Sequence, residues 1–348
     1  METDFLLIGQ GLAGTALGYR LKKSGFRIQI YDQAESNQSS RVAAGLFNPV
    51  TGRKMVKTWN ADQIFPEIIP FYKELENLCE EKFLHQQSIY RPFISIEEQN
   101  EWMGNSADDS FSDYLEEIVQ ESQSEFLNDP FGGVKLKNCG WLDIVTMLDG
   151  MRKFFGEDLK KEWLNLEKLK FEDEFWNYEG LKAKNLIFCN GVAAHQSSYF
   201  DFLPFAPVKG EILEVKQDFS PDYIVNRGVF RVHLGDSVHR VGSTYTWHDL
   251  DHGPTERAKN ELTERLAGLV NQPIEAYVSH KVGIRPATKD RKPFLGKHPD
   301  KQNVYIFDGF GAKGVSLIPY YSKIMVQYLV ESTSIPQEVD IARYFNYI

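Results

Sequence analysis

The first thirty-two residues constrain the fold of this chain more than any other stretch. An apolar run at 4–8 leads directly into the motif Gly-Gln-Gly-Leu-Ala-Gly at 9–14, and the pattern then predicts a helix over 15–23. A second apolar run at 27–31 ends on Asp32. This order of strand, glycine motif, helix, strand and acid is typical of a βαβ unit that binds a dinucleotide.

Each glycine of this motif has a structural role. Gly9 permits the tight turn, Gly11 lets the backbone approach a pyrophosphate, and Gly14 allows close packing of helix and strand. The helix N-terminus offers unpaired N–H groups and a positive dipole end to the phosphates. Asp32 is placed to accept hydrogen bonds from a ribose hydroxyl. The motif by itself does not choose between NAD and FAD.

Composition excludes several classes of protein. The chain has 348 residues, a net charge of −10 and three cysteines, and it contains no C-x-x-C pair. The acidic balance disfavours a free-standing nucleic-acid binder, and the cysteines indicate neither a zinc site nor a disulfide framework. No signal peptide and no membrane span is predicted, and the cysteine usage suits a reducing compartment, so we expect a cytoplasmic protein. We also expect no bound metal.

A second glycine motif lies near the end of the chain. Residues 303–308 predict a strand, Gly309 to Gly314 repeats the spacing G-x-G-x-x-G, and a helix is expected over 315–331. No second strand ending in an acid follows, so this is not an independent dinucleotide site. We expect the start of this helix to face another part of the same ligand. A further buried strand over 184–189 ends on Asn190-Gly191, which suits the ligand-binding edge of a parallel sheet.

A β-rich segment interrupts this α/β pattern. Alternating residues predict strands over 207–215, 228–234, 237–245 and 276–282, and Thr255 is a plausible N-cap for a helix reaching Leu269. The pattern also predicts a helix over 62–83, a strand over 89–96 and a helix opened by 140–143. The stretch 97–129 has no Lys or Arg and reads as a solvated acidic face. The sequence therefore predicts a two-domain protein of the α/β class. One domain is Rossmann-like and the other contains a mixed sheet, so the chain as a whole has an α+β two-domain organisation.

Taken in order, several blocks of the chain resemble one family. Besides the first thirty-two residues, the blocks lie at 39–45, 140–143, 186–191, 207–210, 242–244, 283–290 and 309–314. In this order they resemble the D-amino-acid-oxidase-like group of FAD-dependent oxidoreductases. Glycine oxidase, sarcosine oxidase and the oxidase half of a tRNA-modifying enzyme are the nearest types.

The resemblance implies a discontinuous Rossmann-like FAD-binding domain at 1–57, 140–208 and 283–348, and a mixed-sheet substrate domain at 58–139 and 209–282. It implies non-covalent FAD, because none of the three cysteines lies near the C-terminal blocks. The expected cofactor contacts are Gly9, Gly11, Leu12, Ala13, Gly14, Asp32, Gln33, Ser40, Arg41, Ala43, Ala44, Gly45, Leu46, Asn190, Gly191, Gly309, Phe310, Gly311, Ala312, Lys313, Gly314 and Val315.

The family chemistry implies a substrate site beside the flavin. These enzymes pass a hydride equivalent from the carbon bearing an amine to flavin N5, and the imine is then hydrolysed. Arg285 stands in a glycine-oxidase-like G-x-R-P pattern and would bind a substrate carboxylate. Lys313 replaces an arginine of glycine oxidase, and either supplies positive charge near the flavin or faces solvent. Tyr245 either points into the substrate pocket or is a sheet aromatic.

Three functions therefore remain open at the level of sequence. The leading hypothesis is an FAD-dependent oxidase or dehydrogenase that acts on a small amine or amino acid and passes electrons to dioxygen or another acceptor. The second is removal of a carboxymethyl group from a modified tRNA uridine, which the acidic charge makes less favourable. The third is a flavin-binding protein without turnover. The oligomeric state is not indicated.

Overall fold

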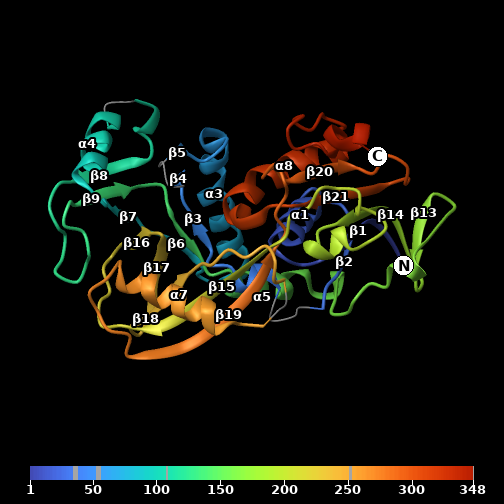
Figure 1. Cartoon of the computed structure of the whole chain (residues 1–348). Helices are drawn as coiled ribbons and strands as arrows, with labels where there is room; N and C mark the ends of the chain where they lie inside the picture. The colour runs from blue at the N-terminus through green and yellow to red at the C-terminus, as the bar shows by residue number, and fades with distance from the viewer. Residues whose placement is uncertain (34–37, 52–55, 107–108, 251–252, 348) are drawn as a thin grey trace.

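Two large sheets dominate the structure, a computed structural model that describes residues 1–348 except 34–37, 52–55, 107–108, 251–252 and 348 (Figure 1). The first sheet has eight strands. In spatial order these are β11 (Leu159–Lys160), β2 (Ile28–Tyr31), β1 (Glu2–Ile8), β14 (Leu181–Phe188), β13 (Phe175–Tyr178) and β12 (Lys170–Glu172), with β21 (Val304–Asp308) beside β14 and β20 (Phe294–Lys297) beside β21.

The centre of this sheet is parallel, which brings the ends of distant segments together. Strand β1 pairs in parallel with both β2 and β14, and β14 pairs in parallel with β21. Strands β1, β2 and β21 are mostly buried, and β14 becomes continuously buried over Leu186–Phe188, as expected for a sheet whose centre is covered on both faces. Their carboxyl ends, at Ile8, Tyr31, Phe188 and Asp308, therefore meet at one edge.

The second sheet also has eight strands, and it is mainly antiparallel. In spatial order these are β19 (Ala276–Arg285), β15 (Val208–Lys216), β18 (Val238–Gly242), β17 (Val229–Gly235), β16 (Ile224–Arg227), β7 (Ile89–Pro92), β9 (Gly133–Leu136) and β8 (Leu115–Val119). Helix α7 (Glu256–Ala267) packs on it through Leu262 and Leu266. Thr255 caps this helix as predicted, because its side chain accepts a hydrogen bond from the N–H of Ala258.

Four helices pack together beside the first sheet: α1 (Leu12–Lys23), α3 (Ala61–Cys79), α5 (Ile144–Phe155) and α8 (Gly314–Glu331). Helix α1 contacts β1, β2 and β21, and α3 packs on α5 and α8. Figure 1 shows α8 crossing the middle of the molecule, between α3 and α1. Shorter elements complete the described chain: α2 (Ser39–Val42), α4 (Ile96–Asn105), α6 (Val192–His195), β3 (Leu46–Phe47), β4 (Val50–Thr51), β5 (Val56–Lys57), β6 (Leu84–Gln86) and β10 (Gly140–Leu142).

Four local predictions differ from the structure. The strand expected over 89–96 ends at Pro92, and α4 begins at Ile96. The block at 140–143 does not open a helix, because Gly140 and its neighbours pair with β3 and β6 and the helix begins only after the Asp143 cap. The helix expected over 62–83 stops at Cys79. The acidic stretch contains strand β8, whose partner β9 is supplied by residues outside that stretch.

The two sheets confirm the predicted fold class of mixed α/β architecture. All strands of the first sheet fall within the segments assigned to the FAD-binding domain. Most strands of the second sheet fall within the segments assigned to the substrate domain, although β19 continues to Arg285. The division of the chain into those domains stays a prediction.

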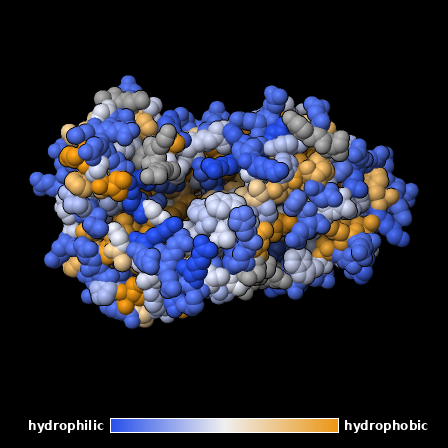
Figure 2. Space-filling view, in the orientation of Figure 1, coloured by the Kyte–Doolittle hydropathy of each residue, from blue (hydrophilic) through white to orange (hydrophobic). Residues whose placement is uncertain are grey.

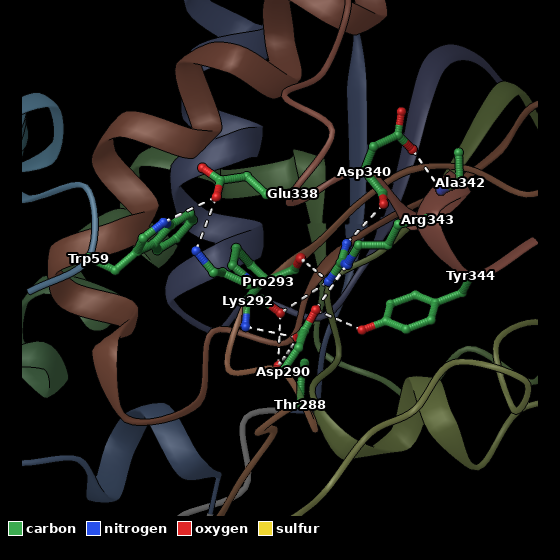
Figure 3. A network of polar contacts seen from close by, with 10 residues as sticks. All are labelled: Trp59, Thr288, Asp290, Lys292, Pro293, Glu338, Asp340, Ala342, Arg343 and Tyr344. Carbon is green, nitrogen blue, oxygen red and sulfur yellow. Dashed lines mark hydrogen bonds and ion pairs between the residues drawn. The ribbon is translucent and has the colours of Figure 1, made fainter.

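The chain beyond α8 fastens the turn that follows β19 (Figure 3). Arg343 and Tyr344 both donate hydrogen bonds to Asp290, and Lys292 pairs with Glu338 while its ammonium lies 3.2 Å from the centre of the Trp59 ring. Asp290 and Lys292 of this turn are thus engaged within the fold. Among the described helices, none has the length and apolar character needed to cross a membrane.

Candidate active site

A cavity of about 650 Å³ lies where the carboxyl edge of the first sheet faces the second sheet. Its wall takes residues from β1, β2 and β21 on one side, and from β15, β16, β17 and β19 on the other. The face of the molecule seen in Figure 2 is mostly hydrophilic around scattered apolar residues. Its wall includes the glycine turns that follow β1, β14 and β21, at Gly9, Gly191 and Gly311.

The glycine motif forms the first part of the wall. Gly9 has a φ of +101°, and a Cβ on Gly14 would stand 1.9 Å from the carbonyl oxygen of Gly9. The turn and the start of α1 are therefore in direct backbone contact, which only glycine allows. The hydroxyl of Ser40 accepts a hydrogen bond of 3.1 Å from the N–H of Leu12 and closes over the helix N-terminus.

Asp32 lies beyond this turn and is held from three sides. Its carboxylate accepts hydrogen bonds from the N–H of Gln10 at 2.9 Å, from the Gln38 amide at 3.1 Å and from the Arg152 guanidinium at 2.9 Å. The Gln38 side-chain oxygen is buried in the cavity wall without a hydrogen-bond partner among the described residues. Trp163 also lines this end, although its side chain is 53% exposed.

Asp308 occupies the middle of the wall. One carboxylate oxygen accepts a hydrogen bond of 2.6 Å from the N–H of Gly191, and the other accepts one of 2.7 Å from the N–H of Gly309. The carboxylate thereby joins the turn after β14 to the turn after β21. Burial raises the pKa of Asp308 to about 7, and the two N–H donors oppose that shift. The buried side-chain oxygen of Asn190 has no hydrogen-bond partner among the described residues.

The far end of the cavity is lined by small residues and a helix start. Gly45 has a φ of +82°, and a Cβ there would stand 2.0 Å from the carbonyl oxygen of Leu142. The turn Gly311–Lys313 leads directly into α8, and the N–H of Gly311 donates to the carbonyl of Pro286. This places a helix N-terminus, with its positive dipole end, at the cavity.

Arg285 enters this end from the last residue of β19. Its guanidinium donates to the Ser243 hydroxyl at 2.7 Å and more weakly to the carbonyls of Lys209 and Thr244. It forms no ion pair with a carboxylate among the described residues. A Cβ on Gly210 would stand 2.1 Å from this guanidinium, so any side chain there would displace the guanidinium from its present position. Burial lowers the pKa of Arg285, and Tyr245, whose ring centre lies 4.4 Å away, opposes that effect.

Lys313 and Tyr245 both line the same end of the cavity. Burial lowers the pKa of Lys313, and the nearby Arg291 and Lys292 lower it further. The two alternatives for Lys313 are not exclusive, because the residue borders the cavity, where the protein partly desolvates its ammonium, and still keeps surface accessible to solvent. Tyr245 borders the cavity with a ring that is 52% exposed, so it is not a core aromatic.

The structure brings together most of the residues expected to contact a cofactor. Those that line the cavity are Gly9, Gly11, Leu12, Ala13, Asp32, Ser40, Ala43, Ala44, Gly45, Leu46, Asn190, Gly191, Phe310, Gly311, Ala312, Lys313, Gly314 and Val315. Four others lie outside its wall, each for a local reason. Gly14 packs on Gly9, Gln33 is exposed, Arg41 forms an ion pair with Asp149, and Gly309 packs on Thr288.

Sequence reasoning missed several residues of the wall. Asp308, Asn226, Phe230 and Trp163 all line the cavity. Asp308 could have been noticed, because it is an acid at the end of a buried strand directly before a glycine turn. Asn226 on β16 and Phe230 on β17 are paired across these two strands, and only the assembly of the second sheet brings them to the cavity. Arg152, which pairs with Asp32, comes from α5 and gave no signal in the sequence.

A Rossmann-like sheet with a glycine motif, a second large sheet and a cavity between them are the features of a two-domain flavoprotein. A profile described as FAD-dependent oxidoreductase matches residues 4–328, which is nearly the whole chain. The chain therefore belongs to the D-amino-acid-oxidase family of FAD-dependent oxidoreductases, as the resemblance implied, and it is an enzyme of that family.

Solved structures of the same fold cover the chain almost completely. Glycine oxidase from Geobacillus kaustophilus is 19% identical with a TM-score of 0.79, covering 99% of this chain and 98% of its own. Iminodiacetate oxidase from a Chelativorans species is 18% identical with a TM-score of 0.80, covering 96% of this chain and 97% of its own.

Sequence relatives are similarly distant. The tRNA 5-methylaminomethyl-2-thiouridine biosynthesis bifunctional protein MnmC of Legionella pneumophila is 22% identical over 91% of this chain and 53% of its own length. The chain thus spans about half of that relative. Glycine oxidase of Pseudomonas aeruginosa is 27% identical, over 35% of each chain.

The cavity wall fits FAD, the cofactor of the family. The backbone contacts at Gly9 and Gly45 leave no room for side chains, and buried polar atoms of Gln38 and Asn190 lack partners among the described residues. The first motif would hold the pyrophosphate, Asp32 the adenosine ribose, and the turn before α8 the flavin ring. No group of three or more His, Cys, Asp or Glu side chains within the described part of the chain could hold a metal ion.

Proposed function

We propose that this enzyme oxidises a C–N bond of an amino acid or secondary amine that carries a carboxylate. Arg285 carries the proposal. Its half-buried guanidinium lies at the end of the cavity that would hold the flavin ring (the ring end), and it has only neutral hydrogen-bond partners among the described residues. A carboxylate would supply the missing charge through paired N–H donors. When bound, FAD supplies the acceptor for the hydride equivalent.

The residues of the ring end would orient the substrate rather than remove a proton from it. Asp32 and Asp308 are the two carboxylates in the described cavity wall, and backbone N–H groups already donate to both. An amine that arrives neutral needs no strong base. Arg285 would hold the carboxylate, and Phe230 and Ile284 would shield the reacting carbon from water. Lys313 and the start of α8 would stabilise negative charge at this end.

Anaerobic reduction of the bound flavin tests this proposal. The FAD-loaded protein is mixed with glycine, N-methylglycine, iminodiacetate, proline and several D-amino acids, and the flavin absorbance is followed. We expect at least one amine that carries a carboxylate to bleach the flavin, and the matching amine without a carboxylate to bleach it far more slowly. If none of these compounds bleaches the flavin, the proposal is wrong.

A second candidate is oxidative removal of a carboxymethyl group from a tRNA uridine. It is supported by the similarity to the tRNA-biosynthesis proteins over 91% of the chain. This substrate also carries a carboxylate on a secondary amine, so Arg285 would serve the same purpose. Treatment of carboxymethylaminomethyl-modified tRNA, followed by nucleoside analysis, separates the two: bleaching by modified tRNA but by none of the free amines would favour the second.

A further inference from the structure

Exposed aromatic rings stand beside Arg285 at the ring end of the cavity. Tyr245 and Trp247 are 52% and 58% exposed, and their rings are stacked with centres 6.5 Å apart. The Arg285 guanidinium lies 4.4 Å from the centre of the Tyr245 ring. Arg285 and Tyr245 line the cavity, and Trp247 stacks on Tyr245 without being a lining residue itself. The cation and the two rings are therefore neighbours in series, beginning at the cavity wall. A free amino acid as small as glycine would leave the outer ring without a contact.

The loop that carries these rings is fixed by the second sheet. Thr246, between the two rings, exchanges two backbone hydrogen bonds with Lys209 on β15, at 2.9 and 3.1 Å. The buried ammonium of Lys209 forms an ion pair of 3.2 Å with Asp249 on the same loop. The backbone N–H of Glu211 donates a hydrogen bond to the hydroxyl oxygen of Thr244 and so holds Thr244 in place. The rings are thus displayed by an anchored loop rather than by a free chain end.

The same anchor also sets the position of Arg285. The carbonyl of Lys209 accepts a hydrogen bond from this guanidinium, and the carbonyl of Thr244 accepts another. The carboxylate-binding group and the exposed rings are consequently held in a fixed relation by one strand and one loop. A rigid aromatic surface binds a flat group with little loss of side-chain entropy.

We propose that Tyr245 and Trp247 form a subsite for a planar ring carried on the substrate nitrogen. The inference rests on the proposed function, because the carboxylate on Arg285 places the amine between the cavity and the rings. It narrows the substrate class from any amine carboxylate to N-substituted glycines and related amino acids whose substituent ends in an aromatic or heteroaromatic ring. Stacking on the Trp247 indole would favour a nitrogen substituent that ends in such a ring over a methyl substituent.

Substrate preference of the FAD-loaded enzyme tests the subsite. We measure kcat/KM for N-benzylglycine and N-methylglycine in the wild type, Trp247→Ala, Trp247→Phe and Tyr277→Ala. Tyr277 is an exposed ring on β19 that does not line the cavity, and it is the matched control. We expect the wild type to prefer N-benzylglycine. Trp247→Ala should lower that preference roughly three- to tenfold, Trp247→Phe should keep most of it, and Tyr277→Ala should leave it unchanged.

Binding of unreactive acids separates the subsite from the reaction. The flavin spectrum reports the dissociation constants of 3-phenylpropionate and propionate, neither of which has an amine to oxidise. The subsite predicts tighter binding of 3-phenylpropionate and a loss of this advantage in Trp247→Ala. If that pattern holds but no amine is oxidised, the proposed function is wrong and the subsite stands. If Trp247→Ala changes neither the substrate preference nor this binding advantage, the subsite is overturned.

Discussion

The two ends of the cavity are built in different ways. The phosphate end, where the first glycine motif would hold the pyrophosphate, is made mainly by one continuous segment, Gly9 to Asp32, through backbone groups and a helix start. Ser40, Gln38 and Arg152 support this segment from elsewhere in the chain. The ring end collects side chains from loops and strands that are far apart in the chain, including Arg285, Tyr245 and Lys313. A local backbone site is determined by glycine positions, whereas an assembled site depends on the registers of several strands. The two ends should therefore respond differently to substitution.

The largest effect is expected at the phosphate end. Gly14→Ala places a Cβ 1.9 Å from the Gly9 carbonyl oxygen, so α1 must move away from the turn. We expect a loss of about 3 kcal/mol in the free energy of unfolding and the loss of FAD binding, measured by urea unfolding and by flavin content. Gly18→Ala, in the same helix, meets only movable side-chain ends and is the control. Equal behaviour of the two variants would contradict this view of the motif.

Substitution at the ring end should separate catalysis from cofactor binding. Arg285→Met removes the guanidinium and should lower kcat/KM for an amine carboxylate by about 2–5 kcal/mol in transition-state terms, with flavin content kept. Gly210→Ala should act in the same direction, because its Cβ would overlap the guanidinium. Steady-state kinetics checks both variants. Unchanged kcat/KM in Arg285→Met would remove Arg285 from the substrate site.

Asp308, between the two ends, should make stability depend on pH. Its pKa is raised from 3.8 to about 7 by burial, so between these values the folded chain keeps a proton that the unfolded chain has lost. Stability conferred by this group is present below pH 4 and falls as pH rises toward 7, by up to about 1.4 kcal/mol per pH unit.

Comparison with a variant that cannot titrate isolates this effect. Asp308→Asn loses one hydrogen-bond acceptor for a backbone N–H, which costs about 1–3 kcal/mol at every pH. The stability gap between wild type and variant should therefore shrink as pH rises from 5 to 7, as measured by urea unfolding. A gap that stays constant over this range would show that Asp308 titrates normally.

The smallest expected effect concerns Trp163 at the adenosine end. Its exposed indole lines the cavity next to the strand that pairs with β2, and it offers a flat surface for the adenine ring. We expect Trp163→Ala to weaken FAD binding about tenfold and Trp163→Phe to weaken it less, by titration of the apoprotein. FMN, which has no adenine, should bind both variants like the wild type. Equal loss of FMN affinity would argue against stacking at this end.

The contrast also explains what the sequence could predict. The βαβ unit follows from the local pattern of apolar residues and from the glycine spacing. Its strands, α1 and Asp32 were therefore predictable from the residues alone. Arg285, Tyr245 and Lys313 were reached through a family resemblance, because no local pattern shows which loops meet. Asn226 and Arg152 were missed for the same reason: a strand pairing brings one to the cavity, and helix packing brings the other to Asp32.

The turn after β19 shows a limit of a different kind. Residues 289–292 form a short charged run in the sequence, and in the fold Asp290 accepts hydrogen bonds from Arg343 and Tyr344 in the C-terminal segment. Lys292 is likewise paired with Glu338. Charge along the sequence cannot predict these partners, since they depend on where the chain returns after α8.

A crystal structure of the FAD complex with a bound carboxylate inhibitor tests the central claim most directly. The account predicts the adenosine beside Asp32, the pyrophosphate at the start of α1, the flavin ring at the start of α8, and the inhibitor carboxylate within hydrogen-bonding distance of Arg285. A flavin ring at the Asp32 end, or a carboxylate bound away from Arg285, would contradict it.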